Sequence, residues 1–584
     1  MRHSGLYAET FIKNYQRSFT GVVFFRLNKA KKSPLKSFRY FFAVKQSIGR
    51  TANGKNLFLF TSHIVKSFGI RYYIRDEKSG YDNKRKKVFD MKKKFGLIAV
   101  ALCVILAFTV FTGCDRGKKE EELSKYTINA VYDEENKTVS ADMTLSYVNG
   151  TDAILDEVCF HLYPAAFREG ARFSPVPADM VSTAYPEGMS YGGIAVNYVT
   201  LAGQNRTVEI AGEDEDILVV ALPEDGKLYP GEKAEISVGF TLEIPCVRHR
   251  FGYTGSTVNL GNWYPVACVF EDGNFVTDPY YANGDPFYSD CADYEVNLTV
   301  PENLTVASTG TSSFLSKDGK KIFSAKASSV RDFAAVIGEF KMLGTQVDGI
   351  DVNYYYVDDA SPETSLTAAA DSIKTFGNLF GKYPYESYSA VETSFLHGGM
   401  EYPGLTMISD LARGDLYTEV IIHETAHQWW YAAVGNNEVA HAWMDEGLTE
   451  FSTSLFYENN PSYNVDYNKR MADALSAYIL YYDSFKHINK DTSMTRKVSE
   501  YSDGFEYTYM NYVKGELMFE ALRNALGDEN FFGGLKTYYE EYKFENAKPD
   551  DMIGCFEKAS GRQLKSFFDS WLEGKVGMYG GLNN

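Results

Sequence analysis

Two histidines and two glutamates in the last third of the chain have the types and spacing needed for metal chemistry. His423, Glu424 and His427 form the pattern H-E-x-x-H, and Glu446 follows after 18 further residues. On a helix the two histidines lie one turn apart, about 5–6 Å between Cβ atoms, and can converge on one ion. Glu424 would then face a water at the metal as a general base. Glu446 would be the third protein ligand, which leaves the fourth position of a catalytic zinc site open.

The residues around this pattern predict the helices that position it. Leu416, Val420 and the two histidines fall at spacings of one helical turn, so they share one helix face. Asp415 is the predicted N-cap, and Gly435, before two asparagines, is the predicted stop. A histidine on an apolar helix face is more often a packed core residue than a ligand. The matching glutamate favours the metal site here.

A second helix is predicted to begin at Glu446, because Leu448, Phe451 and Leu455 lie on one side of that run. Reversal of the chain before it would lay this helix against the first. Glu450, one turn after Glu446, could accept a hydrogen bond from a zinc-binding histidine and so fix its orientation.

A glycine-rich stretch stands just before the metal pattern, in the sequence LHGGMEYPG over Leu396–Gly404. Gly398 and Gly399 allow an extended backbone to pass close to a ligand. Together with Met400 they would line a substrate site, and Glu401 could bind the free α-amino group of a peptide. The alternative is an ordinary strand and turn with a solvated glutamate.

Tyr512 lies in the sequence YVKG at the start of an apolar helix. A tyrosine hydroxyl close to zinc could donate a hydrogen bond to a tetrahedral oxyanion. Because Tyr512 is one of 43 tyrosines in the chain, the amino-acid composition alone would favour an ordinary core residue at this position.

The charge of the chain is strongly uneven. The whole chain carries a formal net charge of −18, yet residues 1–90 are rich in Lys and Arg, whereas the residues after Cys114 are rich in Asp and Glu. So acidic a body is not expected to bind nucleic acid, because binding to the phosphate backbone depends on positive charge.

A secretory signal peptide explains this change in charge. Residues 91–113 contain three lysines, an apolar run and a Thr-Gly pair before Cys114. This pattern resembles a bacterial lipoprotein signal, in which Cys114 becomes the lipidated first mature residue. The acidic body would then be anchored to the cell membrane and face away from the cytoplasm. An uncleaved signal anchor is the alternative.

Residues 1–90 have no predicted structural role. Since a signal peptide belongs at the N-terminus and Met91 can act as a start, we expect an over-extended reading frame there. The alternative is a cytoplasmic basic segment on anionic lipid. The five cysteines after Cys114 contain no C-x-x-C pair, so we expect neither a disulfide framework nor a cysteine zinc site.

The pattern of the remaining chain predicts a multidomain protein. After a charged tether over residues 114–125, alternating apolar and polar residues predict antiparallel strands, with examples at Val139–Tyr147 and Ala234–Ile244. Residues 126–345 therefore predict a β-sandwich or saddle. Helical patterns dominate residues 346–584, from the run that opens at Ser361 to the one over Gln563–Leu572.

Together these residues resemble the aminopeptidase N family of zinc metallopeptidases, the gluzincins that include the leukotriene hydrolases. The matching motifs are GGMEY at Gly398–Tyr402, HETAH at His423–His427, WMDEGLTEF at Trp443–Phe451 and YVKG at Tyr512–Gly515. The segments Phe160–Phe167 and Tyr288–Gly310 are similar to the β domain of the family. The resemblance covers roughly residues 126–575.

The resemblance implies a thermolysin-like α+β, mostly helical catalytic domain behind an N-terminal β saddle. It implies one zinc ion per chain, held by His423, His427 and Glu446. Glu424 would be the general base, Glu401 the amine anchor and Tyr512 the donor to the transition state.

The chain departs from the family pattern at several points. Tyr402 and Asp445 stand where the family usually has Asn, and a second anchoring Glu or Gln from the β domain cannot be placed from the sequence. We expect that the large C-terminal helical domain of the family is missing, which would leave the cleft more open.

The resulting prediction is a membrane-anchored, extracytoplasmic zinc aminopeptidase that acts on peptides. The first alternative is a zinc endopeptidase, or another hydrolase, with the same site. The second alternative is a lipoprotein that binds peptides without turnover.

Overall fold

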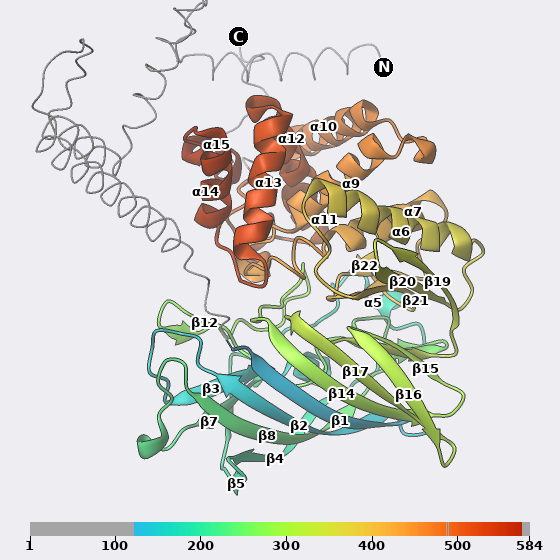
Figure 1. Ribbon diagram of the computed structural model, residues 1–584, viewed down its shortest axis with the longest axis vertical. Helices are drawn as coiled ribbons and strands as arrows, with labels where there is room; N and C mark the ends of the chain where they lie inside the picture. The colour runs from blue at the N-terminus through green and yellow to red at the C-terminus, as the bar shows by residue number, and fades with distance from the viewer. Residues whose placement is uncertain (1–121, 486–487, 489, 575–584) are drawn as a thin grey trace, which may run out of the picture. The chain divides into compact units, whose positions relative to one another are not determined.

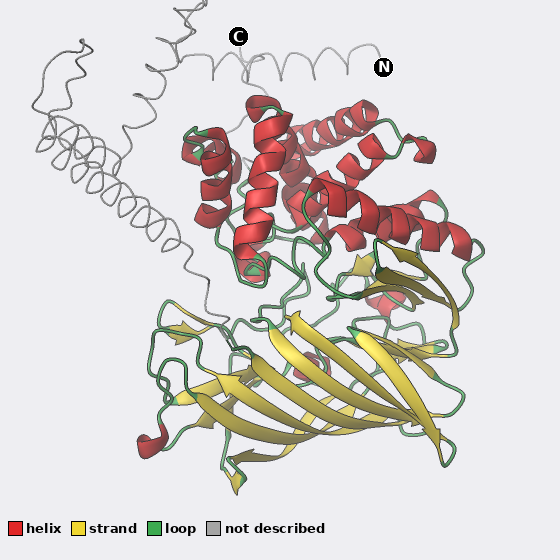
Figure 2. Cartoon of the chain, viewed as in Figure 1, coloured by secondary structure: helices red, strands yellow, loops and turns green. Residues whose placement is uncertain are grey.

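The computed structural model of the chain describes residues 122–485, 488 and 490–574. Strands fill the N-terminal part of this region and helices its C-terminal part (Figures 1 and 2). The predicted basic segment, signal peptide and lipidation site at Cys114 lie outside the described residues. Among the helices described, none is long and apolar enough to cross a bilayer.

A large eight-stranded sheet forms the body of the β-rich part (Figure 1). Its pairing is antiparallel except between the neighbouring strands β14 and β1, which run parallel. The strands in spatial order are β16 (Thr311–Lys317), β17 (Lys320–Val330), β14 (Ala292–Pro301), β1 (Ser124–Asp133), β2 (Thr138–Val148), β8 (Lys233–Glu243), β4 (Gly193–Leu201) and β5 (Gln204–Asn205). The predicted β saddle is therefore confirmed, and β1 begins within the last two residues of the predicted tether.

Smaller sheets complete this part of the fold. Two four-stranded sheets and one hairpin account for them, together with three short helices. The first sheet holds β15 (Thr305–Ser308), β18 (Ala335–Gly338), β10 (Thr257–Leu260) and β9 (Phe251–Thr254); the second holds β11 (Val266–Ala267), β3 (Glu157–His161), β7 (Ile217–Ala221) and β6 (Glu209–Ala211); the hairpin is β12 (Phe270–Glu271) with β13 (Asn274–Phe275); the helices are η1 (Tyr163–Phe167), α5 (Val181–Ala184) and η2 (Glu224–Gly226).

Alternation along the strands builds the core of the β-rich part. In β2 and β8, every second residue is buried, as the sequence pattern predicts, and the residues between them are more exposed except for Gly239 in β8, which the Tyr198 ring covers. The same apolar core extends beyond the β-rich part to Met400, Tyr402 and Leu405. The glycine-rich stretch before the metal pattern is therefore packed directly against the β domain.

A five-stranded sheet opens the catalytic part. Its order is β19 (Lys341–Val347), β20 (Ile350–Tyr356), β21 (Ser387–Thr393), β23 (Leu405–Ser409) and β22 (Gly399–Met400). The strand β22 lies at the edge and runs antiparallel to β23. The predicted domain boundary after residue 345 falls inside β19, because β19 pairs with β20 in this sheet.

Helices build the rest of the catalytic part and surround a second apolar core. Helix α6 packs against both the sheet and α7, and α7 packs against α9, β22 and β23. The elements are α6 (Pro362–Leu379), α7 (Asp415–Ala426), α8 (Glu438–His441), α9 (Glu446–Asn459), η3 (Pro461–Tyr463), α10 (Tyr467–Phe485), η5 (Val498–Glu500), α11 (Gly504–Thr508), the π-helical turn η6 (Tyr509–Lys514), α12 (Gly515–Leu526), α13 (Asp528–Tyr542), α14 (Pro549–Ser560) and α15 (Lys565–Leu572).

The ends of α7 differ from the sequence prediction. Its N-cap is Gly414, at φ 60° and ψ −132°, and Asp415 is the first helical residue. The helix ends at Ala426 rather than near Gly435. The reason lies in the side chains that follow: the Gln428 amide binds the backbone of the glycine-rich stretch, which a continuing helix would direct elsewhere.

Candidate active site

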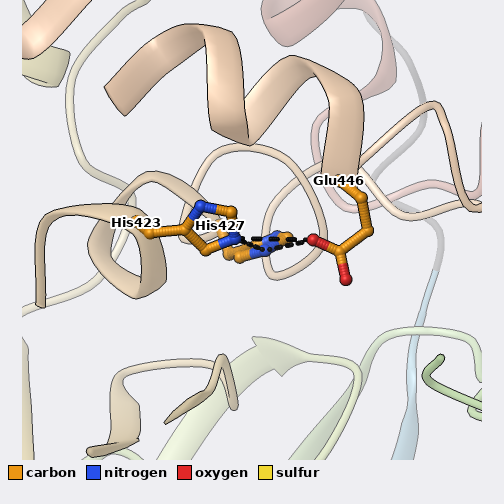
Figure 3. Close-up of side chains that lie close together, drawn as sticks. All are labelled: His423, His427 and Glu446. Carbon is orange, nitrogen blue, oxygen red and sulfur yellow. Dashed lines mark hydrogen bonds and ion pairs between the residues drawn. The ribbon is translucent and has the colours of Figure 1, made fainter. Parts of the chain in front are cut away.

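The two histidines and Glu446 converge on one point (Figure 3). The two Nε2 atoms are 3.2 Å apart, and Glu446 Oε2 lies 3.4 Å from His423 Nε2 and 3.3 Å from His427 Nε2. Donor atoms about 2.0–2.1 Å from a tetrahedral zinc ion lie about 3.3–3.4 Å from one another. The observed triangle therefore fits one face of a zinc site, in agreement with the predicted cofactor.

The folding of α7 and α9 explains this convergence. The chain turns back after Ala426, and α9 begins at Glu446 while packing against α7. At each histidine the other ring nitrogen is occupied: His427 Nδ1 is 2.9 Å from the Trp430 carbonyl oxygen, and His423 Nδ1 is 3.1 Å from Glu450 Oε2. A proton on each Nδ1 leaves both Nε2 lone pairs directed at the metal position.

Glu450 is held in turn by Arg470. The guanidinium of Arg470 donates to Glu450 Oε1 at 2.5 Å, to Glu419 Oε1 at 2.6 Å and to Ser454 Oγ at 2.7 Å. Burial acts to raise the pKa of Glu450, but the charge of Arg470 and the hydrogen bond with His423 outweigh it and lower the pKa to about 2. The sequence indicated Glu450, but it carried no signal for Arg470, which approaches from α10.

Glu424 lies beside the metal position and against the edge strand β22. A side chain at Gly399 would place its Cβ 2.5 Å from Glu424 Cγ, so only glycine leaves room for this carboxylate. Burial raises the pKa of Glu424 to about 7, while the nearby histidines act to lower it. A carboxylate at this position can accept a proton from water and return it.

Glu401 follows β22 and is 3% exposed. Its Oε1 has no hydrogen-bond partner among the described residues. The Gln428 side chain donates to the carbonyl oxygens of Glu401 and Tyr402 at 3.2 Å and accepts from the Gly404 amide at 2.7 Å. Because Gln428 directly follows His427, it ties the glycine-rich stretch to the zinc helix. Burial raises the pKa of Glu401, and Asp285 adds to this effect.

Asp285 brings a carboxylate from the β domain, which sequence reasoning did not find. It lines a cavity of about 520 Å³ together with Gly398, Gly399 and the side chains of His423 and Glu424. Asp285 forms an ion pair with the buried Arg250, which also donates to Tyr280 and to the sulfur of Met400. No periodic pattern marks Asp285, so only the fold reveals it.

Tyr512 also lies at the metal position. Its hydroxyl donates to Glu446 Oε1, and its ring stacks on His423 with centroids 5.8 Å apart. Two glycines permit this approach: a Cβ on Gly515 would lie 2.7 Å from Gly447 Cα. The glycines of the EG and KG dipeptides therefore let α9 and the helix of Tyr512 touch backbone to backbone.

The two positions that depart from the family pattern have different surroundings. The hydroxyl of Tyr402 donates to Asn262 Oδ1 at 2.7 Å, so this side chain links the glycine-rich stretch to the β domain. Asp445 is buried beside the zinc ligand, where Asn436 Nδ2 lies 3.3 Å from its Oδ1. Asp445, Glu401 and His427 also place donor atoms within 4.8 Å of one another.

Comparison with known proteins agrees with this geometry. The model of the peptidase family M1 domain matches residues 364–571, which include all three metal ligands and Tyr512. Residues 364–571 therefore form a peptidase family M1 domain. The family predicted from the four motifs is thereby confirmed, whereas the lipid anchor remains a prediction.

Relatives of the M1 domain include several aminopeptidases. Mitochondrial aminopeptidase 2 of Saccharomyces cerevisiae is 27% identical over 280 residues, which are 45% of this chain and 29% of that protein. Aminopeptidase N of Lactococcus lactis strain IL1403 is 25% identical over 387 residues, which are 62% of this chain and 43% of that protein. This chain thus matches less than half the length of these relatives.

The fold is shared over a wider range. An M1 zinc metallopeptidase from Deinococcus radiodurans superposes with a TM-score of 0.57 at 17% sequence identity, and the match covers 78% of this chain and 94% of that one. A variant of that protein bound to the substrate Tyr-Ser-Ala gives a TM-score of 0.55 at 18% identity. The arrangement of a β saddle before a mostly helical catalytic domain is therefore the predicted M1 fold.

Proposed function

We propose that this M1 protein is a zinc aminopeptidase that removes N-terminal residues from peptides. The carrying observation is the triangle of His423, His427 and Glu446, whose edges of 3.2–3.4 Å fit a zinc ion. A general base, an amine-binding carboxylate and a tyrosine hydroxyl surround this triangle. The aminopeptidases among the relatives and the structural neighbour with a bound substrate also support the proposal.

Each group of the proposed site has its own role in the hydrolysis. When bound, zinc supplies a Lewis acid that polarises the scissile carbonyl and makes a water molecule more acidic. Glu424 takes a proton from the attacking water and returns it to the leaving amine. Tyr512 gives up its hydrogen bond to Glu446 and donates to the oxyanion that forms on the substrate. Loss of one such donor costs about 3–4 kcal/mol of barrier height.

The α-ammonium group of the substrate determines which peptide bond is cleaved. Glu401 has a buried oxygen with no hydrogen-bond partner among the described residues, and the charge of Asp285 from the β domain lies near enough to raise the pKa of Glu401 further. A peptide with a free N-terminus supplies the cation that Glu401 lacks. A blocked peptide would leave this carboxylate buried without a partner, which disfavours its binding.

We also propose a site of action for the enzyme, based on the N-terminal part of the sequence. The pattern of residues 91–113 and Cys114 supports an extracytoplasmic enzyme held on the cell membrane by a lipid. Mass spectrometry of the protein isolated from membranes tests this proposal. A lipid-modified N-terminal Cys114 is expected, and a chain that starts at Met1 without lipid would contradict it.

Hydrolysis of matched peptides tests the proposed activity. Free peptides should be cleaved one residue at a time, their N-acetylated counterparts should remain intact, and a chelator should stop the reaction. Replacement of Glu401 by Ala should raise KM for free peptides more than it changes kcat. Cleavage of both peptide sets at internal bonds would indicate the endopeptidase alternative.

A further inference from the structure

Two large apolar side chains line the cavity that holds the zinc site without being buried in it. Leu416 and Phe505 both belong to the cavity wall, yet they are 59% and 57% exposed. Wall residues that are more than half exposed lie at the mouth of the cavity. Neither residue has a role in the hydrolysis proposed above. Apolar side chains that stay exposed beside a binding site commonly contact a ligand, so these two residues need a functional explanation.

Helix α7 indicates the direction in which a bound peptide runs. Its cavity-lining face extends from Leu416 in the first turn to His423 at the zinc site. The proposed amine anchor Glu401 lies beyond the other end of the helix. Its carboxylate is within 4.8 Å of a ring nitrogen of His427, and Gln428 donates to its carbonyl oxygen at 3.2 Å. The residues that follow the scissile bond therefore extend from His423 towards Leu416, away from Glu401.

The edge strand β22 supports the same direction. Gly399 lies against Glu424, whereas the Cβ position of the preceding Gly398 is 3.4 Å from Val420 Cγ2. Both glycines line the cavity, and β22 is the last strand of its sheet. Extended peptides commonly bind along such an edge. A peptide on this edge passes from Glu424 to Val420 and on towards Leu416.

The length of α7 relates the mouth of the cavity to a position in the substrate. Leu416 precedes His423 by seven residues, which is about 10 Å along a helix that rises 1.5 Å per residue. An extended peptide covers about 3.3 Å per residue, so about three residues span this distance. The third residue after the scissile bond, which is the fourth residue of the substrate, therefore reaches Leu416 and Phe505.

The surroundings of the mouth favour an apolar side chain there. Glu419 follows Leu416 by about one helical turn and forms an ion pair with Arg470 at 2.6 Å, so this acid does not need a cation from the substrate. Phe505 packs on the ring of Tyr509 with centroids 4.5 Å apart, which holds it in place. The two exposed apolar side chains are then free to cover a third one.

We propose that Leu416 and Phe505 bind an apolar side chain on the fourth residue of the substrate. The enzyme therefore prefers peptides of at least four residues with an apolar residue at that position. The inference rests on the proposed aminopeptidase function, because the position is counted from the amine anchor Glu401. Removal of the apolar side chain from water supplies binding energy away from the reacting bond.

Two peptides of identical composition test this inference. Ala-Ser-Ser-Leu-Ser-Ser carries its leucine at the fourth residue, and Ala-Ser-Ser-Ser-Ser-Leu carries it at the sixth. The initial rate of alanine release by the zinc enzyme gives kcat/KM for each peptide. The first peptide should be favoured about 5- to 20-fold, because a partly covered leucine side chain gains part of its full transfer free energy.

Variants locate the preference. Leu416→Ser and Phe505→Ser should each lower the ratio of the two kcat/KM values about threefold or more, because each removes one side of the apolar contact. Leu480→Ser is the matched control, since Leu480 is 69% exposed on α10 and is not among the residues that line the cavity. It should leave the ratio unchanged. Zinc content and thermal melting show whether each variant is folded.

Two results would overturn the inference alone. One is a ratio near one for the wild type, although alanine is released from both peptides. The other is a high ratio that both Leu416→Ser and Phe505→Ser retain. Absence of alanine release from either peptide by the zinc-loaded wild type is a different outcome, which would refute the proposed aminopeptidase function and the inference with it.

Discussion

His423 Nδ1 lies 3.1 Å from Glu450 Oε2, and the second oxygen of that carboxylate accepts a hydrogen bond from Arg470 at 2.5 Å. This relationship links a zinc ligand on α7 to a cation on α10 through one residue of α9. It fixes the orientation of the imidazole ring and makes His423 a stronger ligand. The ion pair of Glu450 with Arg470 in turn keeps the carboxylate charged.

Replacement of Glu450 by Ala should weaken zinc binding by about 10- to 100-fold, because His423 loses the partner that orients it. Competition with a fluorescent chelator measures this affinity. Lys469→Ala, which changes an exposed residue on α10, serves as the control. Equal zinc affinity in the Glu450 variant and the wild type would show that this hydrogen bond does not support the ligand.

Glu424→Gln should retain zinc but lower kcat by about 100- to 10,000-fold, because the amide cannot take a proton from water. The measurement combines metal analysis with hydrolysis of a free peptide. Substantial turnover by a variant with full zinc content is the outcome that contradicts the assignment of the base.

Gly399→Ala should lower kcat/KM by about 100-fold or more, because its Cβ would lie 2.5 Å from Glu424 Cγ and displace the base. The neighbouring Gly398→Ala is the matched comparison, since its nearest atom, Val420 Cγ2, is 3.4 Å away. The loss in Gly398→Ala should be much smaller. Similar kinetics for both variants would contradict the close contact between β22 and the base.

The dependence of stability on acidic pH should reveal the ion pair between Glu506 and Arg496. Although burial acts to raise it, hydrogen bonds from Ser502 and the charge of Arg496 lower the pKa of Glu506 from 4.5 to about 2. A lowered pKa stabilises the fold above the unfolded value of 4.5, and the contribution is lost as the pH falls towards 2. After allowance for solvent screening, it amounts to about 2 kcal/mol at pH 7.

Thermal melting of metal-free wild type and Glu506→Gln measures this contribution. The variant should melt at a lower temperature at pH 7, and the difference should shrink below about pH 4.5. A difference that stays constant down to pH 3.5 would mean that the charge of Glu506 does not contribute to stability.

Local patterns in the sequence predicted much of the site. Spacing on one helix identifies His423 and His427, and strand alternation identifies β2 and β8, because these signals depend on neighbours in the chain. The close packing of Gly399 against Glu424 and of Gly447 against Gly515 explains why the motifs contain glycine.

Other features depend on contacts between distant segments. Asp285 and Arg470 have no periodic spacing relative to the metal pattern, and they reach the site only through the packing of the β domain and α10. The early end of α7 has the same origin. The hydrogen bonds of Gln428 to the glycine-rich stretch outweigh the local preference for a longer helix.

The most direct test of the account combines metal analysis with peptide hydrolysis on the protein from residue 115 onwards. We predict one zinc ion per chain, release of the first residue from free peptides, no cleavage of the N-acetylated peptides, and loss of activity with chelator. Absence of bound zinc, or chelator-resistant hydrolysis, would contradict the central claim that His423, His427 and Glu446 form a catalytic zinc site.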